Sequence, residues 1–249
     1  MSQWIGFAVG AAFVGLFGWA LAWGMRYNTR RNEQERRQQP VRERRARELG
    51  WRYDGTPDGD IRYRFEGYTA DSLRWTMKFD SDAGSSSSTP KLLWQTSGLK
   101  SQRIELMLGS RSYVEGLTSG AGRKVIGAAN FVLGRLVGGS LQDMGEFVAA
   151  AKVVSSGRGA AEGFAVASRD GALARRLLHD PELSRLLTSW PREMPKGFVP
   201  ARSVSAQLDR EGLKLTVNID GPPMAVCEHL AKLGEALAVR LRDGRGLVG

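Results

Sequence analysis

An uninterrupted apolar run near the N-terminus constrains this chain more than any other feature. The run from Trp4 to Met25 contains no ionisable side chain, whereas the whole chain of 249 residues has the apolar content, 42%, of an ordinary globular protein. About 22 helical residues, rising ~1.5 Å each, span roughly 33 Å and would cross the hydrocarbon core of a bilayer. The sequence therefore predicts one transmembrane helix within residues 1–25.

Charge on the two sides of this run predicts its orientation. No charged side chain precedes it, whereas an arginine cluster follows it: Arg26, Arg30, Arg31, Arg36 and Arg37. Basic residues beside a transmembrane helix stay in the cytoplasm, so we expect a single-pass protein of the inner (plasma) membrane with its N-terminus outside. A cleaved signal peptide ending at Ala20-Leu21-Ala22 is the alternative, and the missing basic n-region disfavours it.

Small residues recur in the predicted span and raise the question of self-association. Gly6 and Gly10 form one GxxxG pattern, which lets two helix backbones approach closely. A homodimer through this face is one interpretation. The other is the ordinary abundance of glycine and alanine in membrane helices.

The segment 26–48 is strongly basic, with nine Arg against four Glu in a chain of net charge +10. We expect a juxtamembrane helix or linker that Pro40 breaks or kinks, or in which Pro40 starts a second helical piece. The positive-inside rule alone accounts for its charge, which favours a topology signal and solvated spacer. The Arg26–Arg37 cluster would also contact anionic lipid headgroups. Binding of nucleic acid is the least favoured reading, because only Tyr27 is available to stack on a base.

The remainder, 49–249, is predicted to be one cytoplasmic α+β domain. Alternating apolar and polar residues predict half-buried strands, most clearly over 73–80, and a mobile serine-rich loop follows at 81–90. The further strands expected in an antiparallel sheet are 62–66, 92–94, 104–108, 163–168 and a hairpin over 204–219 that turns at 209–212.

Helical spacing predicts the rest of the domain. The glycine-rich stretch 125–151 reads as one packed helix, as two shorter helices, or as a helix followed by a strand around Phe147. Ser168 is the expected cap of a helix over 170–179, and Asp180 that of a helix over 182–189. After Pro222 and Pro223, an amphipathic C-terminal helix turns these residues inward: Val226, Leu230, Leu233, Leu237 and Leu241. A partly open barrel capped by this helix, as in pleckstrin-homology-like folds, would fit this order of strands and helices.

No catalytic, cofactor or metal motif stands out. The two histidines, His179 and His229, belong to no metal-binding pattern, and the single Cys227 falls on the core side of the last helix. The G-x-S-x-G pattern of serine hydrolases is missing, and the glycines of 120–124 lack the spacing of a phosphate-binding loop. We therefore assign no catalytic, cofactor-binding or metal-binding residue.

Several short motifs together resemble a class of bacterial membrane-anchored proteins. They are the N-terminal span, the basic segment, Leu49-Gly50-Trp51, and the run from Phe164 to Leu178. The similarity covers 48–241. It implies a cytoplasmic α+β domain and supplies no catalytic residue.

Three functional hypotheses follow from these patterns. The first is a membrane-tethered, non-enzymatic scaffold or accessory module that binds a protein partner and touches anionic lipid through its basic segment. The second is a membrane-bound hydrolase that uses a serine with His179 or His229. The third is tethering of nucleic acid by the arginine-rich segment, whose affinity would fall steeply with salt.

Overall fold

The computed structural model describes residues 19, 33, 36–55, 61–80, 90–120, 122, 140–156, 163–194 and 198–244. Its strands are β1 (Arg52–Gly55), β2 (Ile61–Tyr68), β3 (Arg74–Asp80), β4 (Lys91–Thr96), β5 (Leu106–Ser110), β6 (Lys152–Ser155), β7 (Phe164–Ser168), β8 (Val204–Asp209) and β9 (Gly212–Asn218). Its helices are α2 (Arg111–Thr118), α4 (Ser140–Ala150), α5 (Gly171–His179), α6 (Pro181–Thr188), α7 (Pro200–Ser203) and α8 (Met224–Gly244), with a 3-10 turn η1 (Ser97–Leu99) and a helical segment at 36–48.

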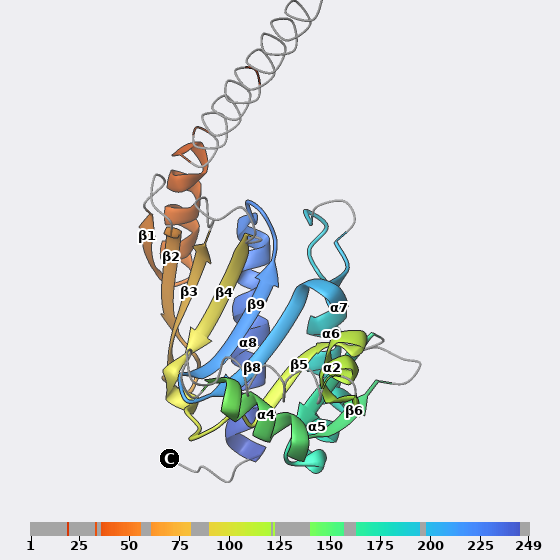
Figure 1. The fold of residues 1–249 in the computed structure, drawn as a ribbon. Coiled ribbons are helices and arrows are strands. Elements are labelled where there is room, and N and C mark those ends of the chain that lie inside the picture. The colour runs from red at the N-terminus through yellow and green to blue at the C-terminus, as the bar shows by residue number, and fades with distance from the viewer. Residues whose placement is uncertain are drawn as a thin grey trace, which may run out of the picture.

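The strands form one nine-stranded sheet in the order β1-β2-β3-β4-β9-β8-β5-β7-β6, and every pairing is antiparallel (Figure 1). An α+β fold with an antiparallel sheet is thus what the structure supports. The sheet is larger than the meander of about four strands that the sequence suggested. It is also open, since β1 and β6 are its edges, so the barrel analogy is wrong.

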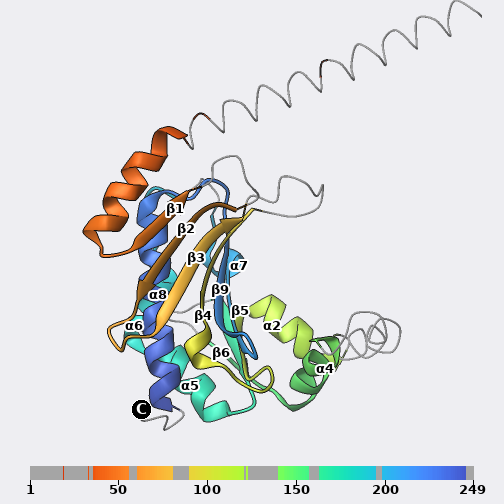
Figure 2. The same ribbon diagram turned by 90° about the vertical axis from the view of Figure 1, so that its left-hand side faces the viewer.

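The main core lies between one face of the sheet and helix α8. The five apolar positions predicted to turn inward on α8 are all buried, as is Cys227. They pack on large side chains of the central strands, among them Trp75 and Trp94, together with α5 and α6 on the same face (Figure 2). The spacing of three and four residues produces this contact because it places one apolar stripe along the helix.

A smaller core lies on the opposite face and covers only part of it. Val114 of α2 and Phe147 and Val148 of α4 pack over β5 and β7, on Met107, Ala165 and Ala167. Figure 2 shows α2 and α4 on this side, away from α8. No described helix lies over β1–β4 and β9 on this face.

The helical segment 36–48 packs on the domain with its second half. Ala46 is buried in the main core, and the Arg42 guanidinium carbon lies 4.3 Å from the centre of the Tyr63 ring. Arg45 forms a two-point ion pair with Glu228 of α8, at 2.7 and 3.1 Å. This half is therefore part of the fold, rather than the solvated spacer that its charge suggested.

The end of this segment explains the Leu49-Gly50-Trp51 motif. Gly50 has a φ of 71°, a left-handed conformation that glycine adopts at low cost, and the Trp51 amide donates to the Ala46 carbonyl at 2.8 Å. This turn directs the Trp51 ring onto Trp75, edge to face, with ring centres 5.0 Å apart.

The membrane prediction requires correction. In the described part of the chain no helix is both long and apolar enough to cross a bilayer. Helix α8 is long enough, but it carries charged side chains along its length, including Glu228, Lys232 and Arg240. The fold class is therefore α+β without a supported transmembrane helix, and a single-pass inner-membrane location is not supported. The predicted span 1–25 itself lies outside the described residues, apart from Trp19.

Several local predictions are confirmed or corrected. Strands over 62–66, 73–80, 92–94 and 163–168, the hairpin 204–219 and the last helix all exist. Phe147 lies in a helix, so the strand alternative there is wrong. Asp170, rather than Ser168, caps α5. The loop 81–89 and residues 123–139 lie outside the described residues.

Candidate functional site

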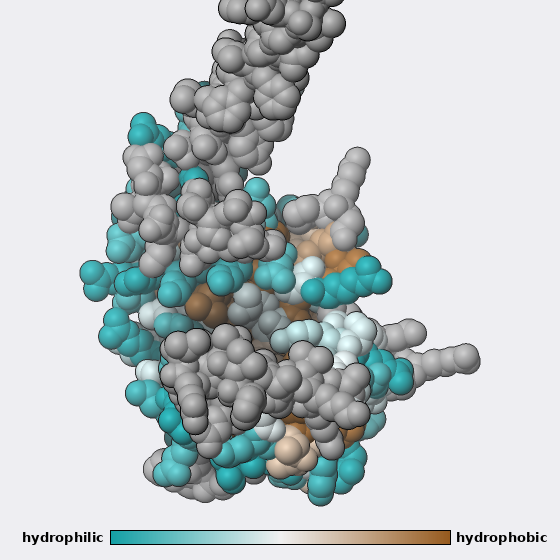
Figure 3. Space-filling model, in the orientation of Figure 1, coloured by the Kyte–Doolittle hydropathy of each residue, from teal (hydrophilic) through white to brown (hydrophobic). Residues whose placement is uncertain are grey.

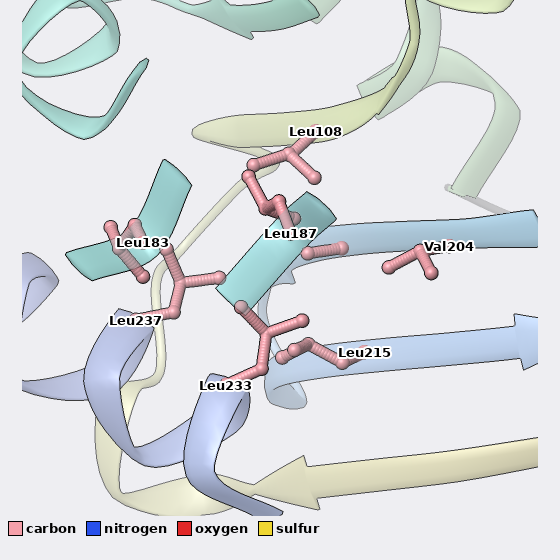
Figure 4. A pocket seen from close by; sticks show the side chains of 8 residues that line it. Leu108, Leu183, Leu187, Val204, Leu215, Leu233 and Leu237 are labelled. Atoms are coloured by element: carbon pink, nitrogen blue, oxygen red, sulfur yellow. The ribbon is translucent and has the colours of Figure 1, made fainter. Parts of the chain in front are cut away.

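Two cavities among the described residues do not resemble a substrate site. One lies in the main core and is lined by apolar side chains only, from α6, α8 and the neighbouring strands (Figure 4). A second lies in the smaller core, where the hydroxyl of Thr118 is already bonded to the Val114 carbonyl. Neither hollow has a titratable lining residue, so we interpret both as packing gaps.

His229 has a structural role. Its Nε2 lies 2.7 Å from the carbonyl oxygen of Leu186, and because a carbonyl only accepts, the ring donates in this contact. The Trp190 indole donates to the next carbonyl, that of Leu187, and its ring centre lies 4.5 Å from that of His229. Together the two rings satisfy carbonyls at the end of α6, which a helix terminus otherwise leaves open.

Burial of His229 lowers the pKa of its ring, and the contact with Leu186 only partly opposes this. The other histidine, His179, is exposed at the end of α5. Its neighbour Asp180 pairs with Arg240 of α8. Arg240 and His229 are 11 positions apart on α8, roughly 16 Å along the helix axis. The two histidines therefore lie at separate places.

The serine that most resembles an activated hydroxyl is Ser155 of β6. Its hydroxyl donates to Glu115 of α2 at 2.5 Å, and Arg111 pairs with the same carboxylate at 2.9 Å. These two contacts lower the pKa of Glu115, the serine contact more than the arginine contact. A carboxylate with a lowered pKa is a poor proton acceptor, so the arrangement favours a link between β6 and α2 over catalysis.

Metal ligation finds no support in the described residues. They contain no group of three or more His, Cys, Asp or Glu side chains placed to hold an ion. The thiol of Cys227 is buried 3.9 Å from the Tyr63 hydroxyl, which agrees with its prediction as a core residue.

The predicted lipid-contact residues are divided by the structure. Arg36 and Arg37 are exposed on the segment 36–48. Arg26, Arg30 and Arg31 lie outside the described residues, as do Gly6 and Gly10 of the predicted dimer face. The contact of this cluster with lipid stays a prediction.

The side chains with the best geometry for binding lie on the part of the sheet over which no described helix packs. Alternation along β2, β3, β4 and β9 turns apolar side chains toward α8 and mostly polar ones the opposite way. We call the half-buried outward residues of β2, β3, β4 and β9 the open face: Arg64, Glu66, Thr76, Lys78, Lys91, Leu93, Gln95, Lys214 and Thr216. Where Figure 3 shows this side in colour, both hydrophilic and apolar surface are visible.

Strand register arranges the open face into two cross-strand rows. One row runs Arg64, Lys78, Leu93, Thr216, and the other runs Glu66, Thr76, Gln95, Lys214. The charged side chains of the second row are neutralised by ion pairs with neighbouring residues. Glu66 pairs with Arg74 at 2.8 Å, and Lys214 pairs with Glu211 at 2.6 Å and Asp209 at 3.4 Å.

The first row carries positive charge that no direct ion pair neutralises among the described side chains, and the charges of Arg64 and Lys78 reach Glu66 and Glu211 only at a distance. Arg64 and Lys78 are directly opposite each other. Lys91 lies on β4 two residues before Leu93, opposite Asp80 of β3. None of these three cations forms an ion pair with a described residue. Asp54, which faces Arg64 from β1, does not come within ion-pair distance.

Sequence reasoning missed this site for an identifiable reason. The polar positions of β2 and β3 were visible as the outward half of each alternation, but the sequence does not contain the register that places Arg64 beside Lys78. Neither a model of a known protein family, nor a curated protein, nor a solved structure matches this chain.

Proposed function

We propose that this chain is a non-enzymatic interaction module that binds a protein partner on the open face. The observation that carries the proposal is the uneven covering of the sheet. One face is packed by α8, α5 and α6, whereas the other carries described helices only over β5–β7–β6. The remaining strands present a broad surface in which polar side chains surround the apolar Leu93. A mixture of this kind is typical of non-obligate protein interfaces.

The described chemistry favours binding over catalysis. His229, Ser155 and Cys227 each have a structural partner in the fold. The two described cavities have no convergent polar groups, which a substrate pocket requires. The hydrolase hypothesis therefore gains no geometric support from these residues.

Quantitative affinity capture of the tagged full-length chain tests the proposal. The open-face variant is Leu93→Ala with Gln95→Ala, two half-buried outward side chains of β4. The matched control is Val41→Ala with Val199→Ala, which truncates exposed apolar side chains elsewhere. We expect a protein captured in stoichiometric amount by the wild type and the control, and lost by the open-face variant. Equal capture by both variants would place the interaction elsewhere and contradict the proposal.

A further inference from the structure

We propose that the partner segment bound by the open face is acidic, and that Arg64, Lys78 and Lys91 bind its carboxylates. This inference rests on the proposed function and specifies the chemistry of the partner. It follows from the positions of these three cations on β2, β3 and β4.

The sheet contains a pair of like charges on neighbouring strands. Arg64 and Lys78 occupy directly opposed positions of β2 and β3. Like charges in that arrangement destabilise a sheet. The nearby cations Arg74 and Lys214, in contrast, each have a carboxylate partner. A carboxylate from a partner would convert the repulsive pair into two charge-assisted hydrogen bonds.

An apolar side chain and a hydroxyl lie beside the three cations. Leu93 follows Lys78 in the same row, and Thr216 follows Leu93. The surface therefore offers positive charge next to a small apolar area and a hydroxyl. A segment that alternates carboxylates with apolar side chains complements it in both respects.

The charge pattern favours a short acidic segment over nucleic acid. Carboxylates are interspersed on the same face, with Glu66, Asp209 and Glu211 beside the second row. They would repel a continuous phosphate backbone. Tyr68, an exposed aromatic residue of β2, is four positions from Arg64, roughly 13 Å along a strand, with Glu66 between them. A base stacked on Tyr68 would place its phosphate near that carboxylate.

Direct binding of defined probes to the full-length chain tests the inference. The probes are a short labelled peptide that alternates Glu with Leu and Ser, its Gln counterpart, and a short DNA duplex. The charge variant is Arg64→Gln with Lys78→Gln. The matched control is Arg175→Gln with Arg185→Gln, two exposed arginines of α5 and α6.

We expect the acidic peptide to bind the wild type and the control equally, and the charge variant about tenfold more weakly, a difference of about 1.4 kcal/mol. The affinity should fall with salt, and the Gln peptide should not bind. Equal binding of the acidic peptide to the charge variant would overturn the inference, as would preferential binding of the duplex.

Thermal unfolding of the charge variant supplies an independent readout. Because the variant removes a repulsive pair, its Tm should equal or exceed that of the wild type. A lower Tm would show that the cations are paired within the chain and would refute the acidic-partner inference.

The two proposals fail in distinguishable ways. If the open-face variant loses a captured protein while the charge variant retains it, the interaction module stands and the acidic partner is refuted. If neither variant loses it, both proposals fall.

Discussion

Close packing at single residues sets the separation between α8 and the sheet. A Cβ added to Gly234 of α8 would lie 2.5 Å from Cδ2 of Trp94, a distance that real Cβ atoms do not adopt. The absence of a side chain at this position lets the helix lie directly on the indole. The same relation holds within the sheet, where a Cβ on Gly67 would lie 2.4 Å from the Trp75 ring.

Substitution of Gly234 should therefore be destabilising despite the helical propensity of alanine. We expect Gly234→Ala to reduce the free energy of unfolding by about 1–3 kcal/mol through overpacking. The control is Gly116→Ala in the exposed part of α2, where no atom lies within 4 Å of the added Cβ. That change should stabilise by about 0.5–1 kcal/mol. Urea unfolding of both variants measures the difference, and a neutral Gly234→Ala would contradict the packing argument.

His229 predicts a pH dependence of stability. Its folded-state pKa lies below the ordinary value of 6.5, because burial disfavours the charged ring. The unfolded state therefore binds the proton first as pH falls, and stability is lost from about pH 6.5 downward to the folded-state pKa. In His229→Gln this contribution disappears. Between about pH 7.5 and 5.5 the Tm of the variant should therefore fall less than that of the wild type. Exposed His179→Gln is the control, and a slope identical to wild type in His229→Gln would refute the prediction.

At the scale of elements, Asp180 connects three helices. It follows α5, its carboxylate accepts from the Leu183 amide of α6 at 2.8 Å, and it pairs with Arg240 of α8 at 3.1 Å. Burial alone would raise the pKa of Asp180, but the Leu183 amide and Arg240 outweigh it and lower the pKa. This one side chain therefore serves as both a helix cap and an interhelical ion pair.

The two roles of Asp180 can be separated by substitution. Asp180→Asn keeps a capping oxygen and removes the charge, whereas Asp180→Ala removes both. We expect Asp180→Ala to cost about 1–2 kcal/mol and Asp180→Asn clearly less, because asparagine caps helices well. Glu182→Gln, which removes the other partner of Arg240, is the control for the ion pair. Equal losses in Asp180→Asn and Asp180→Ala, measured by urea unfolding, would assign the stability to the charge.

Elements with a strong period could be predicted from the sequence, and short ones could not. The alternation over 73–80 and the stripe of α8 are properties of local sequence and gave β3 and α8 with accurate faces. The strands β1 and β6 have only four residues each, too few to show a period, and both were missed. Strand order and register depend on pairings between distant segments. The cross-strand row that brings Arg64 beside Lys78 could therefore not be predicted from local sequence patterns.

At the scale of the whole molecule, the folded unit begins before residue 49. The sequence placed the domain boundary at the Leu49-Gly50-Trp51 motif, because charge dominates the preceding segment. The structure buries Arg42 and Ala46 of that segment against the domain. A basic segment can thus be part of a core when its few inward positions have partners.

Comparison of shortened chains measures this contribution. A chain of residues 36–249 keeps Ala46 in the core and Arg42 over Tyr63, whereas a chain of residues 49–249 loses both. From the buried methyl group and the cation–π contact alone, we expect the shorter chain to be less stable by on the order of 2 kcal/mol. Arg42→Gln with Ala46→Ser in the longer chain should reproduce part of this loss, because these two side chains make the contact together with the Arg45–Glu228 ion pair. Equal unfolding midpoints for the two chains in urea would show that the segment rests on the domain without stabilising it. The fold would then begin, as the sequence suggested, at residue 49.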